Sequence, residues 1–169
     1  NNISDKITLA FWVYGNPNKL PANTSIFEAV DANNVRQLNL HLPWSDGSIY
    51  WDCGNDGTGY DRINKAATTT EIEGQWNFWA VTKDATTGVM KIFLNGSLWH
   101  SGTGKSKLIS IDRMKISTSI TGGYLYYGGI DDFTIWNTAL DSAEINQLMA
   151  HSVQPMRSAL RSIALSRWP

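Results

Sequence analysis

Short segments of alternating apolar and polar residues recur along this 169-residue chain at intervals of about ten residues. Successive side chains of a β-strand point to opposite faces, so a period of two is typical of strands with one buried face. Gly, Asn and Asp separate the segments, and no long helical periodicity occurs before residue 139. Strands are therefore predicted at residues 7–14, 25–30, 37–42, 48–53, 76–83, 89–94, 98–100 and 113–117. This pattern predicts an all-β fold, a two-sheet antiparallel jelly-roll β-sandwich.

Residues 128–145 predict a last strand that runs directly into a short C-terminal helix. Phe133 and Ile135 alternate with polar or amphipathic neighbours, as in a half-buried strand. Asp141 or Ser142 then supplies an N-cap oxygen for the helix that follows.

Two adjacent carboxylates, Asp131 and Asp132, lie inside this last strand, where acidic residues are normally depleted. One explanation is a bound cation, and calcium prefers such oxygen ligands. The other is that Asp132 accepts hydrogen bonds from loop amides or pairs with Arg113 or Lys115.

The composition excludes several classes of protein. A net charge of -1 gives no electrostatic reason to expect nucleic acid or an anionic membrane as partner. No apolar run approaches the roughly 20 residues that a transmembrane helix needs. Charged residues make up only 17%, which favours a secreted or cell-surface all-β domain. The single cysteine, Cys53, can form neither an internal disulfide nor a Cys-based zinc site, and is predicted to be a small buried residue.

Eight tryptophans are the outstanding compositional feature. Aromatic rings fill cores, and they also stack on apolar ligand faces such as those of sugars. Four of them lie in the strongest strand patterns and are assigned to packing: Trp12, Trp76, Trp79 and Trp136. The candidate ligand contacts are Trp44, Trp51, Trp99, Tyr124 and Tyr126, of which the two tyrosines are expected to share one strand face.

A polar, Gly-rich segment at residues 55–62 provides a second set of candidates. Asp56 and Asp61 lie there, close to Asp52. Their oxygens could bind sugar hydroxyl groups or a cation, whereas the alternative is a solvated loop with Asx turns.

The character of the chain changes near its C-terminus. Residues 1–153 are predicted to form the sandwich, and residues 154–169 a basic amphipathic tail. The tail could pack on the sandwich, mediate self-association or lie on a membrane surface.

Several separated segments resemble one known family. The stretch W-x-F-W-A-V-T-K-D at residue 76 leads into I-F-L-N-G-S-L-W-H-S, which ends at residue 101. Together with residues 11–13, 41–52 and 129–145, it resembles the concanavalin A-like lectin/glucanase superfamily, in its laminin-G-like and pentraxin-like branch. The resemblance covers about residues 7 to 150.

This resemblance implies a sandwich with one concave and one convex sheet. Many members bind glycans or extracellular protein ligands, and several carry calcium. In related sandwiches the first Asp of the last strand helps to hold a structural calcium ion, and Asp131 occupies that position here.

Glycosidases of the superfamily place two catalytic carboxylates on one strand, typically as Glu-x-Asp-x-Glu. Glu71 and Glu73 have an i, i+2 spacing that would place both on one face of a strand, but no Asp lies between them. The leading interpretation is thus a non-catalytic extracellular binding module for carbohydrate. The alternatives are a protein-interaction or adhesion module without a sugar site, and an unusual glycan hydrolase.

Overall fold

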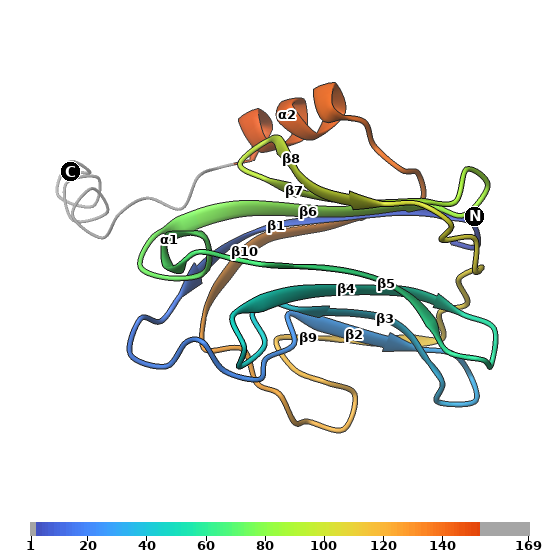
Figure 1. The fold of residues 1–169 in the computed structure, drawn as a ribbon, viewed down its shortest axis with the longest axis horizontal. Helices are drawn as coiled ribbons and strands as arrows, with labels where there is room; N and C mark the ends of the chain where they lie inside the picture. Colours follow the sequence, from blue (N-terminus) through green and yellow to red (C-terminus); the bar gives the residue numbers. More distant parts are fainter. Residues whose placement is uncertain (1–2, 153–169) are drawn as a thin grey trace, which may run out of the picture.

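A computed structural model describes residues 3–152, which form two five-stranded antiparallel sheets stacked face to face (Figure 1). The upper sheet has the order β10-β1-β6-β7-β8 and the lower sheet the order β5-β4-β3-β2-β9. The strands are β1 (Lys6–Gly15), β2 (Phe27–Val30), β3 (Arg36–His41), β4 (Ser48–Asn55), β5 (Tyr60–Ala66), β6 (Trp76–Asp84), β7 (Val89–Leu94), β8 (Ser97–Gly102), β9 (Arg113–Ile116) and β10 (Gly128–Trp136). The predicted jelly-roll sandwich is confirmed. The predicted tail, residues 154–169, lies outside the described residues.

Local sequence signals determine the turns and the C-terminal helix as predicted. Asn95 and Gly96 both have positive φ, as a type I′ turn between β7 and β8 requires. The helix α2 (Ser142–His151) begins after Asp141, whose side chain accepts hydrogen bonds from the first-turn amides.

Two elements were not predicted, β5 and the short helix α1 (Thr69–Ile72). In β5, Ile63 is the only apolar residue that points into the core, since the terminal Ala66 is exposed, so the strand shows no hydrophobic alternation. It forms instead by pairing along the whole of β4. The helix α1 follows from a capping box between Thr68 and Glu71.

Inward-facing side chains of both sheets form the core. Phe11 stacks on Phe133, and Phe27 meets both rings and Trp51 edge-on. Cys53 is fully buried in the same core, as predicted, and burial raises the pKa of its thiol.

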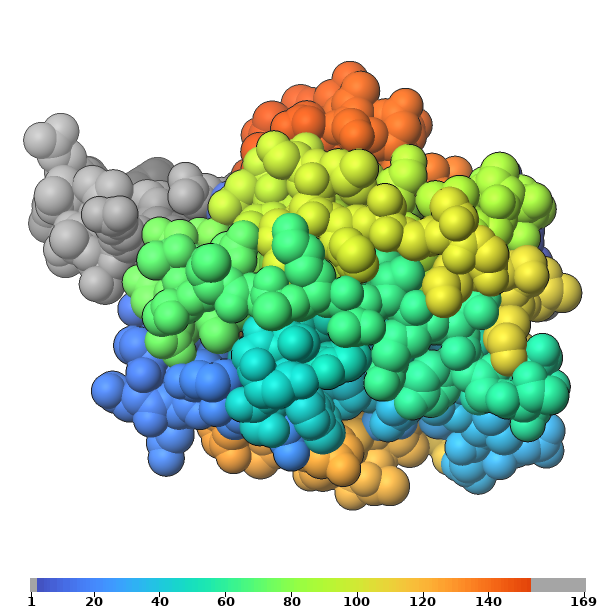
Figure 2. Space-filling view, viewed as in Figure 1, coloured from blue at the N-terminus to red at the C-terminus, as the bar shows by residue number. Residues whose placement is uncertain are grey.

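The helix α2 covers the outer face of the upper sheet (Figure 2). Its buried Ile145 packs with outward-facing residues of the upper sheet, namely Ala10, Trp12, Phe78, Ala80 and Phe93. Trp12 also donates a hydrogen bond to Ser152 Oγ at the end of the helix (2.8 Å). Neither helix in residues 3–152 has the length and apolar character needed to cross a bilayer.

The predicted packing of Trp12 and Trp79 is confirmed, since both are buried. The prediction for Trp136 is wrong, because its side chain is 41% exposed. This residue lies opposite Thr8 at the end of β10, the edge strand of the upper sheet, where no further strand covers it.

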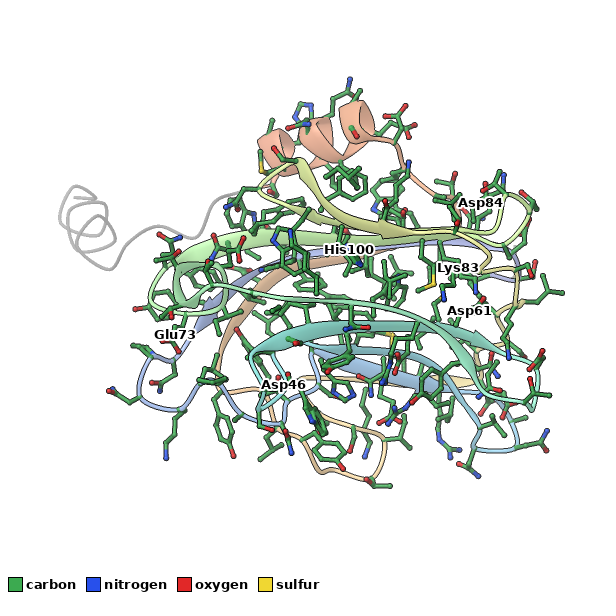
Figure 3. All side chains as sticks on the ribbon, in the orientation of Figure 1. Asp46, Asp61, Glu73, Lys83, Asp84 and His100 are labelled. Atoms are coloured by element: carbon green, nitrogen blue, oxygen red, sulfur yellow. The ribbon has the colours of Figure 1, made fainter. Side chains whose placement is uncertain are left out.

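An ion pair joins the two sheets inside the sandwich. Lys83 of β6 and Asp61 of β5 face each other between the layers (Figure 3), with 2.7 Å between Nζ and Oδ2. Lys83 is fully buried and also donates to the Cys53 carbonyl oxygen, while Asp61 also accepts from the backbone N–H of Lys107. The carboxylate of Asp61 is therefore part of the core.

Candidate functional site

Within residues 3–152, no helix lies over the outer face of the lower sheet, unlike that of the upper sheet (Figure 1). Because Leu38, Leu40, Trp51 and Cys53 point inward, their neighbours in β3 and β4 point outward. The strand register brings five polar residues into one row across this face, in the order Lys115, Glu28, Asn39, Asp52 and Arg62.

Two arginines are anchored by carboxylates of this row. Arg62 donates to both oxygens of Asp52, from Nε at 2.6 Å and from Nη2 at 2.8 Å. Arg36 donates from Nε to Glu28 at 2.9 Å, and its Nη1 lies 3.6 Å from Asp52. Since Asp52 is fully buried beneath the two guanidinium groups, it fixes their positions.

Two tyrosine rings alternate with the arginines. The guanidinium carbon of Arg62 lies 4.8 Å from the ring centre of Tyr50 and 5.0 Å from that of Tyr60. The guanidinium carbon of Arg36 lies 5.7 Å from the ring centre of Tyr60. These cation–π contacts hold the guanidinium groups and the tyrosine rings together in one preformed surface.

A second group of aromatic residues lies beside this stack. Trp44 lies in the turn before β4, and its ring centre is 4.4 Å from the ring centre of His41 and 5.2 Å from that of Tyr124. Tyr124 belongs to the segment 117–127 between β9 and β10, has a left-handed backbone conformation and is 45% exposed. Its carbonyl oxygen accepts a hydrogen bond from the Ser25 backbone N–H, which ties the segment to the sheet.

A backbone hydrogen bond orients the imidazole ring of His41. Its Nδ1 lies 2.6 Å from the Thr24 carbonyl oxygen, so Nδ1 carries the proton and Nε2 is left as an acceptor. Burial lowers the pKa of His41 below 6.5, although the Thr24 bond and the Asp52 charge act in the opposite direction.

The lowered pKa predicts a stability that depends on pH. Because the unfolded chain binds a proton at His41 more readily than the folded one, the free energy of unfolding should fall as the pH drops below about 6.5 and level off below the folded-state pKa. Urea denaturation between pH 7.5 and 5 measures this dependence. The variant His41→Gln should lose part of it, whereas an unchanged pH profile in that variant would contradict the assignment.

Asp46 provides the exposed charge of the site. Its carboxylate accepts from the Tyr50 hydroxyl (2.6 Å) and the Ser48 backbone N–H (2.8 Å). Both bonds, the Tyr50 bond above all, lower the pKa of Asp46, and the bond to Asp46 raises the pKa of Tyr50. Figure 3 places Asp46 on the outer side of the lower sheet, away from the pair between the layers.

Together these side chains enclose a pocket of about 350 Å³. Its lining consists of Arg36, His41, Trp44, Asp46, Tyr50, Tyr60, Arg62 and Tyr124. The volume lies at the lower end of the roughly 300–1,000 Å³ that is usual for small-ligand sites. Flat aromatic surfaces and a few fixed hydrogen-bonding groups can hold one sugar ring by stacking and by contacts with its hydroxyl groups.

Of the predicted ligand contacts, Trp44 and Tyr124 meet in this pocket. Trp51 and Tyr126 are both buried in the core between the sheets, and neither ring lines the pocket. The expectation that Tyr124 and Tyr126 share a strand face is wrong, because segment 117–127 is not a strand.

The other predicted contacts are engaged elsewhere. Asp61 is paired with the buried Lys83. Asp56 lies in an exposed loop, where its carboxylate accepts from Lys107 at 2.8 Å. Trp99 donates to Glu71 Oε1 (2.8 Å) outside the pocket. These three residues and the two buried rings therefore lie outside the pocket.

Six lining residues were not among the predicted contacts: Arg36, His41, Asp46, Tyr50, Tyr60 and Arg62. The alternation in β3 and β4 carried a signal for His41 and Tyr50, since both lie between inward-facing apolar residues. Tyr60 and Arg62 could not be identified as candidates, because the strand that carries them, β5, was not predicted from the sequence.

Asp131 remains a predicted calcium ligand. Calcium takes six to eight oxygens, yet residues 3–152 contain no group of three or more His, Cys, Asp or Glu that could hold a metal ion. The Asp131 carboxylate accepts from the Asp132 backbone N–H (2.9 Å), and one Asp132 oxygen is buried without a partner in the described part of the chain. Within this part, no ion pair joins Asp132 to Arg113 or Lys115. The described side chains do not by themselves supply a calcium site.

Glu71 and Glu73 do not form a glycosidase pair. Glu71 lies in the helix α1 and Glu73 is its C-cap, so the strand spacing expected of them does not occur. One Glu71 oxygen accepts from the Thr68 backbone N–H and the other from Trp99. This carboxylate is therefore occupied by structural contacts.

A second hollow of about 620 Å³ opens between the sheets at the edge formed by β9 and β10. Its lining is largely apolar and includes Ile7, Leu38, Ile109, Met114 and Ile135. The hollow is also lined by Ser4, Ser110, Asp112 and Arg113. None of its described lining residues is aromatic, so it suits a sugar less well than the pocket on the lower sheet.

A family model described as the concanavalin A-like lectin/glucanases superfamily matches residues 1–146. No curated protein sequence matches the chain. Among solved structures, the receptor-binding domain of botulinum neurotoxin C/D mosaic serotype has a TM-score of 0.65 and 19% identity, covering 86% of this chain and 36% of that one. The native heptameric SAP-like pentraxin from Limulus polyphemus has a TM-score of 0.65 and 17% identity, covering 90% and 74%.

A botulinum neurotoxin serotype D ligand-binding domain in complex with N-acetylneuraminic acid has a TM-score of 0.65 and 18% identity, covering 89% of this chain and 38% of that one. The chain thus spans little more than a third of the toxin domains it matches. Because the sequence identities are this low, the similarity to these structures shows a shared fold alone.

Proposed function

This chain belongs to the concanavalin A-like lectin/glucanase superfamily, and from that membership we propose that it is a non-catalytic carbohydrate-binding module whose site is the pocket on the lower sheet. The single observation that carries the proposal is the preformed pocket itself. It combines exposed aromatic surface with fixed hydrogen-bonding groups, as a sugar ring requires.

Each lining group has a role in this proposal. The rings of Trp44 and Tyr124 offer a surface on which the apolar face of a sugar can stack. The Asp46 carboxylate and His41 Nε2 accept hydrogen bonds from hydroxyl groups, and Arg62 donates. The similar fold of a toxin ligand-binding domain in complex with N-acetylneuraminic acid supports a sugar as ligand class.

The absence of catalysis is part of the proposal. Glycoside hydrolysis needs two carboxyl groups that flank the scissile bond. The pocket lining offers one carboxyl group, that of Asp46. The carboxylate of Asp52 lies beneath the pocket, where it is fully buried and bound by Arg62.

A glycan-array screen with the chain as it stands tests the proposed function. We expect binding to at least one class of printed oligosaccharide and no release of shorter sugars when the same compounds are incubated with the protein. Binding to none of the printed classes would contradict a carbohydrate site and favour the protein-interaction alternative. Release of shorter sugars would instead favour a hydrolase.

A further inference from the structure

The hydrogen-bond donors of the pocket gather at one end, around Tyr60. The side chains of Arg36 and Arg62 are 25% and 35% exposed, and their guanidinium carbons lie 5.7 Å and 5.0 Å from the Tyr60 ring centre. Within residues 3–152, Nη2 of Arg36 and Nη1 of Arg62 have no hydrogen-bond partner. The Tyr60 hydroxyl accepts from Arg62 Nη2 (3.1 Å), so its own proton is left to donate. These three residues form the donor end of the pocket.

The carboxylates beneath the donor end offer little to a ligand. Arg62 binds both oxygens of Asp52. Glu28 accepts from Arg36 Nε at one oxygen and from the Ile120 backbone N–H at the other (3.0 Å). Both acids are buried, so they orient the guanidinium groups while the outer nitrogens face the pocket.

The acceptors lie at the other end of the pocket, beside Trp44. Asp46 belongs to the same turn as Trp44, and His41 Nε2 accepts because Nδ1 holds the proton. Tyr50 separates the two ends, since its ring packs on Arg62 and its hydroxyl donates to Asp46. In the described part of the chain, no ion pair joins Asp46 to an arginine. The pocket therefore has a donor end and an acceptor end.

The charges of this face do not repel an anion. The pocket and the row of polar residues across the sheet contain three cations and three carboxylates, namely Arg36, Arg62, Lys115, Glu28, Asp46 and Asp52. Two of the carboxylates are buried beneath the guanidinium groups, and the third lies at the acceptor end. A ligand at the donor end thus meets the positive groups at the shortest distance, where the Coulomb interaction is strongest.

A carboxylate can only accept hydrogen bonds, and its two oxygens match the planar donors of guanidinium groups. Hydroxyl groups of the same sugar can donate to Asp46 and to His41 Nε2. Resting on the proposed function, we infer that the pocket takes a sugar that carries a carboxylate, a uronic or sialic acid, with the carboxylate at the donor end and the ring on Trp44. The specificity-determining groups are the outer nitrogens of Arg36 and Arg62.

Matched glycans measure this preference. The probes are trigalacturonic acid with galactotriose and 3′-sialyllactose with lactose, printed as pairs on one array. We expect the acidic member of at least one pair to bind at least about tenfold more tightly than its neutral partner, the effect of one hydrogen bond between charged groups. Fully methyl-esterified trigalacturonic acid keeps the chain length and loses the charge, so it should bind no more tightly than galactotriose.

Lysine in place of either arginine keeps a charge for the buried carboxylate and removes the outer nitrogens. Arg36→Lys and Arg62→Lys should each lose most of the preference for acidic over neutral glycans. The control Arg113→Lys, at an exposed arginine of β9 outside the pocket, should retain it. Urea denaturation shows whether each variant is folded, and the methyl ester tests the same contact without a substitution.

Three results would overturn the inference and leave the carbohydrate site standing. They are neutral glycans that bind as tightly as their acidic partners, a preference that both lysine variants leave unchanged, and tighter binding of 3′-sulfated lactose than of 3′-sialyllactose. Binding to no glycan at all would overturn the proposed function itself.

Discussion

Replacing Lys83 with methionine should lower the free energy of unfolding by about 3–5 kcal/mol, the usual cost of removing one partner from a buried ion pair. Lys83 is fully buried, and its Nζ lies 2.7 Å from Asp61 Oδ2 and 2.7 Å from the Cys53 carbonyl oxygen. Without the ammonium group, the bond from the Lys107 backbone N–H is the only one that the Asp61 carboxylate keeps among residues 3–152. A charge with one partner inside the sandwich is strongly destabilising.

Urea denaturation at pH 7, followed by tryptophan fluorescence, measures this loss. The double variant Lys83→Met/Asp61→Asn should recover much of it, since the amide oxygen can still accept from Lys107. The control is Lys6→Met, which removes a more exposed ion pair with Asp84 (3.4 Å) close to the same end of the sheet and should cost at most about 1 kcal/mol. Equal losses in Lys83→Met and Lys6→Met would contradict a role for the buried pair.

Replacing Trp44 with alanine should weaken glycan binding at least roughly thirtyfold, which corresponds to about 2 kcal/mol and is typical of an aromatic hot spot. The indole lines the pocket between His41 and Tyr124, so its removal takes away stacking surface at the centre of the site. Trp44→Phe should retain part of the affinity, because a smaller ring still stacks. Isothermal titration with the tightest glycan of the array measures both variants.

The control for Trp44 is Trp136→Ala. Trp136 is 41% exposed on the edge strand β10, outside the pocket. This change should leave the affinity for the glycan unaltered. Equal losses in the two variants would mean that the glycan does not stack on Trp44.

The fold could be predicted from local patterns. Period-two alternation revealed the strands whose inner faces are apolar, as in β3 with Leu38 and Leu40. The strand β5 was not predicted, because one of its inward positions holds Asp61, whose burial depends on Lys83 from the other sheet. Such a pairing is a tertiary contact that a single strand does not encode.

The site was harder to predict than the fold. Trp44 could be singled out because it follows Pro43 in a turn, and Tyr124 because it lies in a Gly-flanked segment. Their meeting depends on segment 117–127, which is tied to the sheet by the bonds from Ser25 to Tyr124 and from Ile120 to Glu28. Conversely, the sequence did not distinguish Trp51 from the other candidate tryptophans. Only the structure shows that its side chain points into the core.

The central claim is that a glycan binds on the outer face of the lower sheet. Nuclear magnetic resonance of the ¹⁵N-labelled chain, titrated with the tightest glycan of the array, locates the binding site directly. The proposed function predicts the largest shifts at the indole N–H of Trp44 and at the amides of Asp46, Tyr50 and Tyr124. Largest shifts at the groove between β9 and β10, or around α2 on the upper sheet, would contradict it.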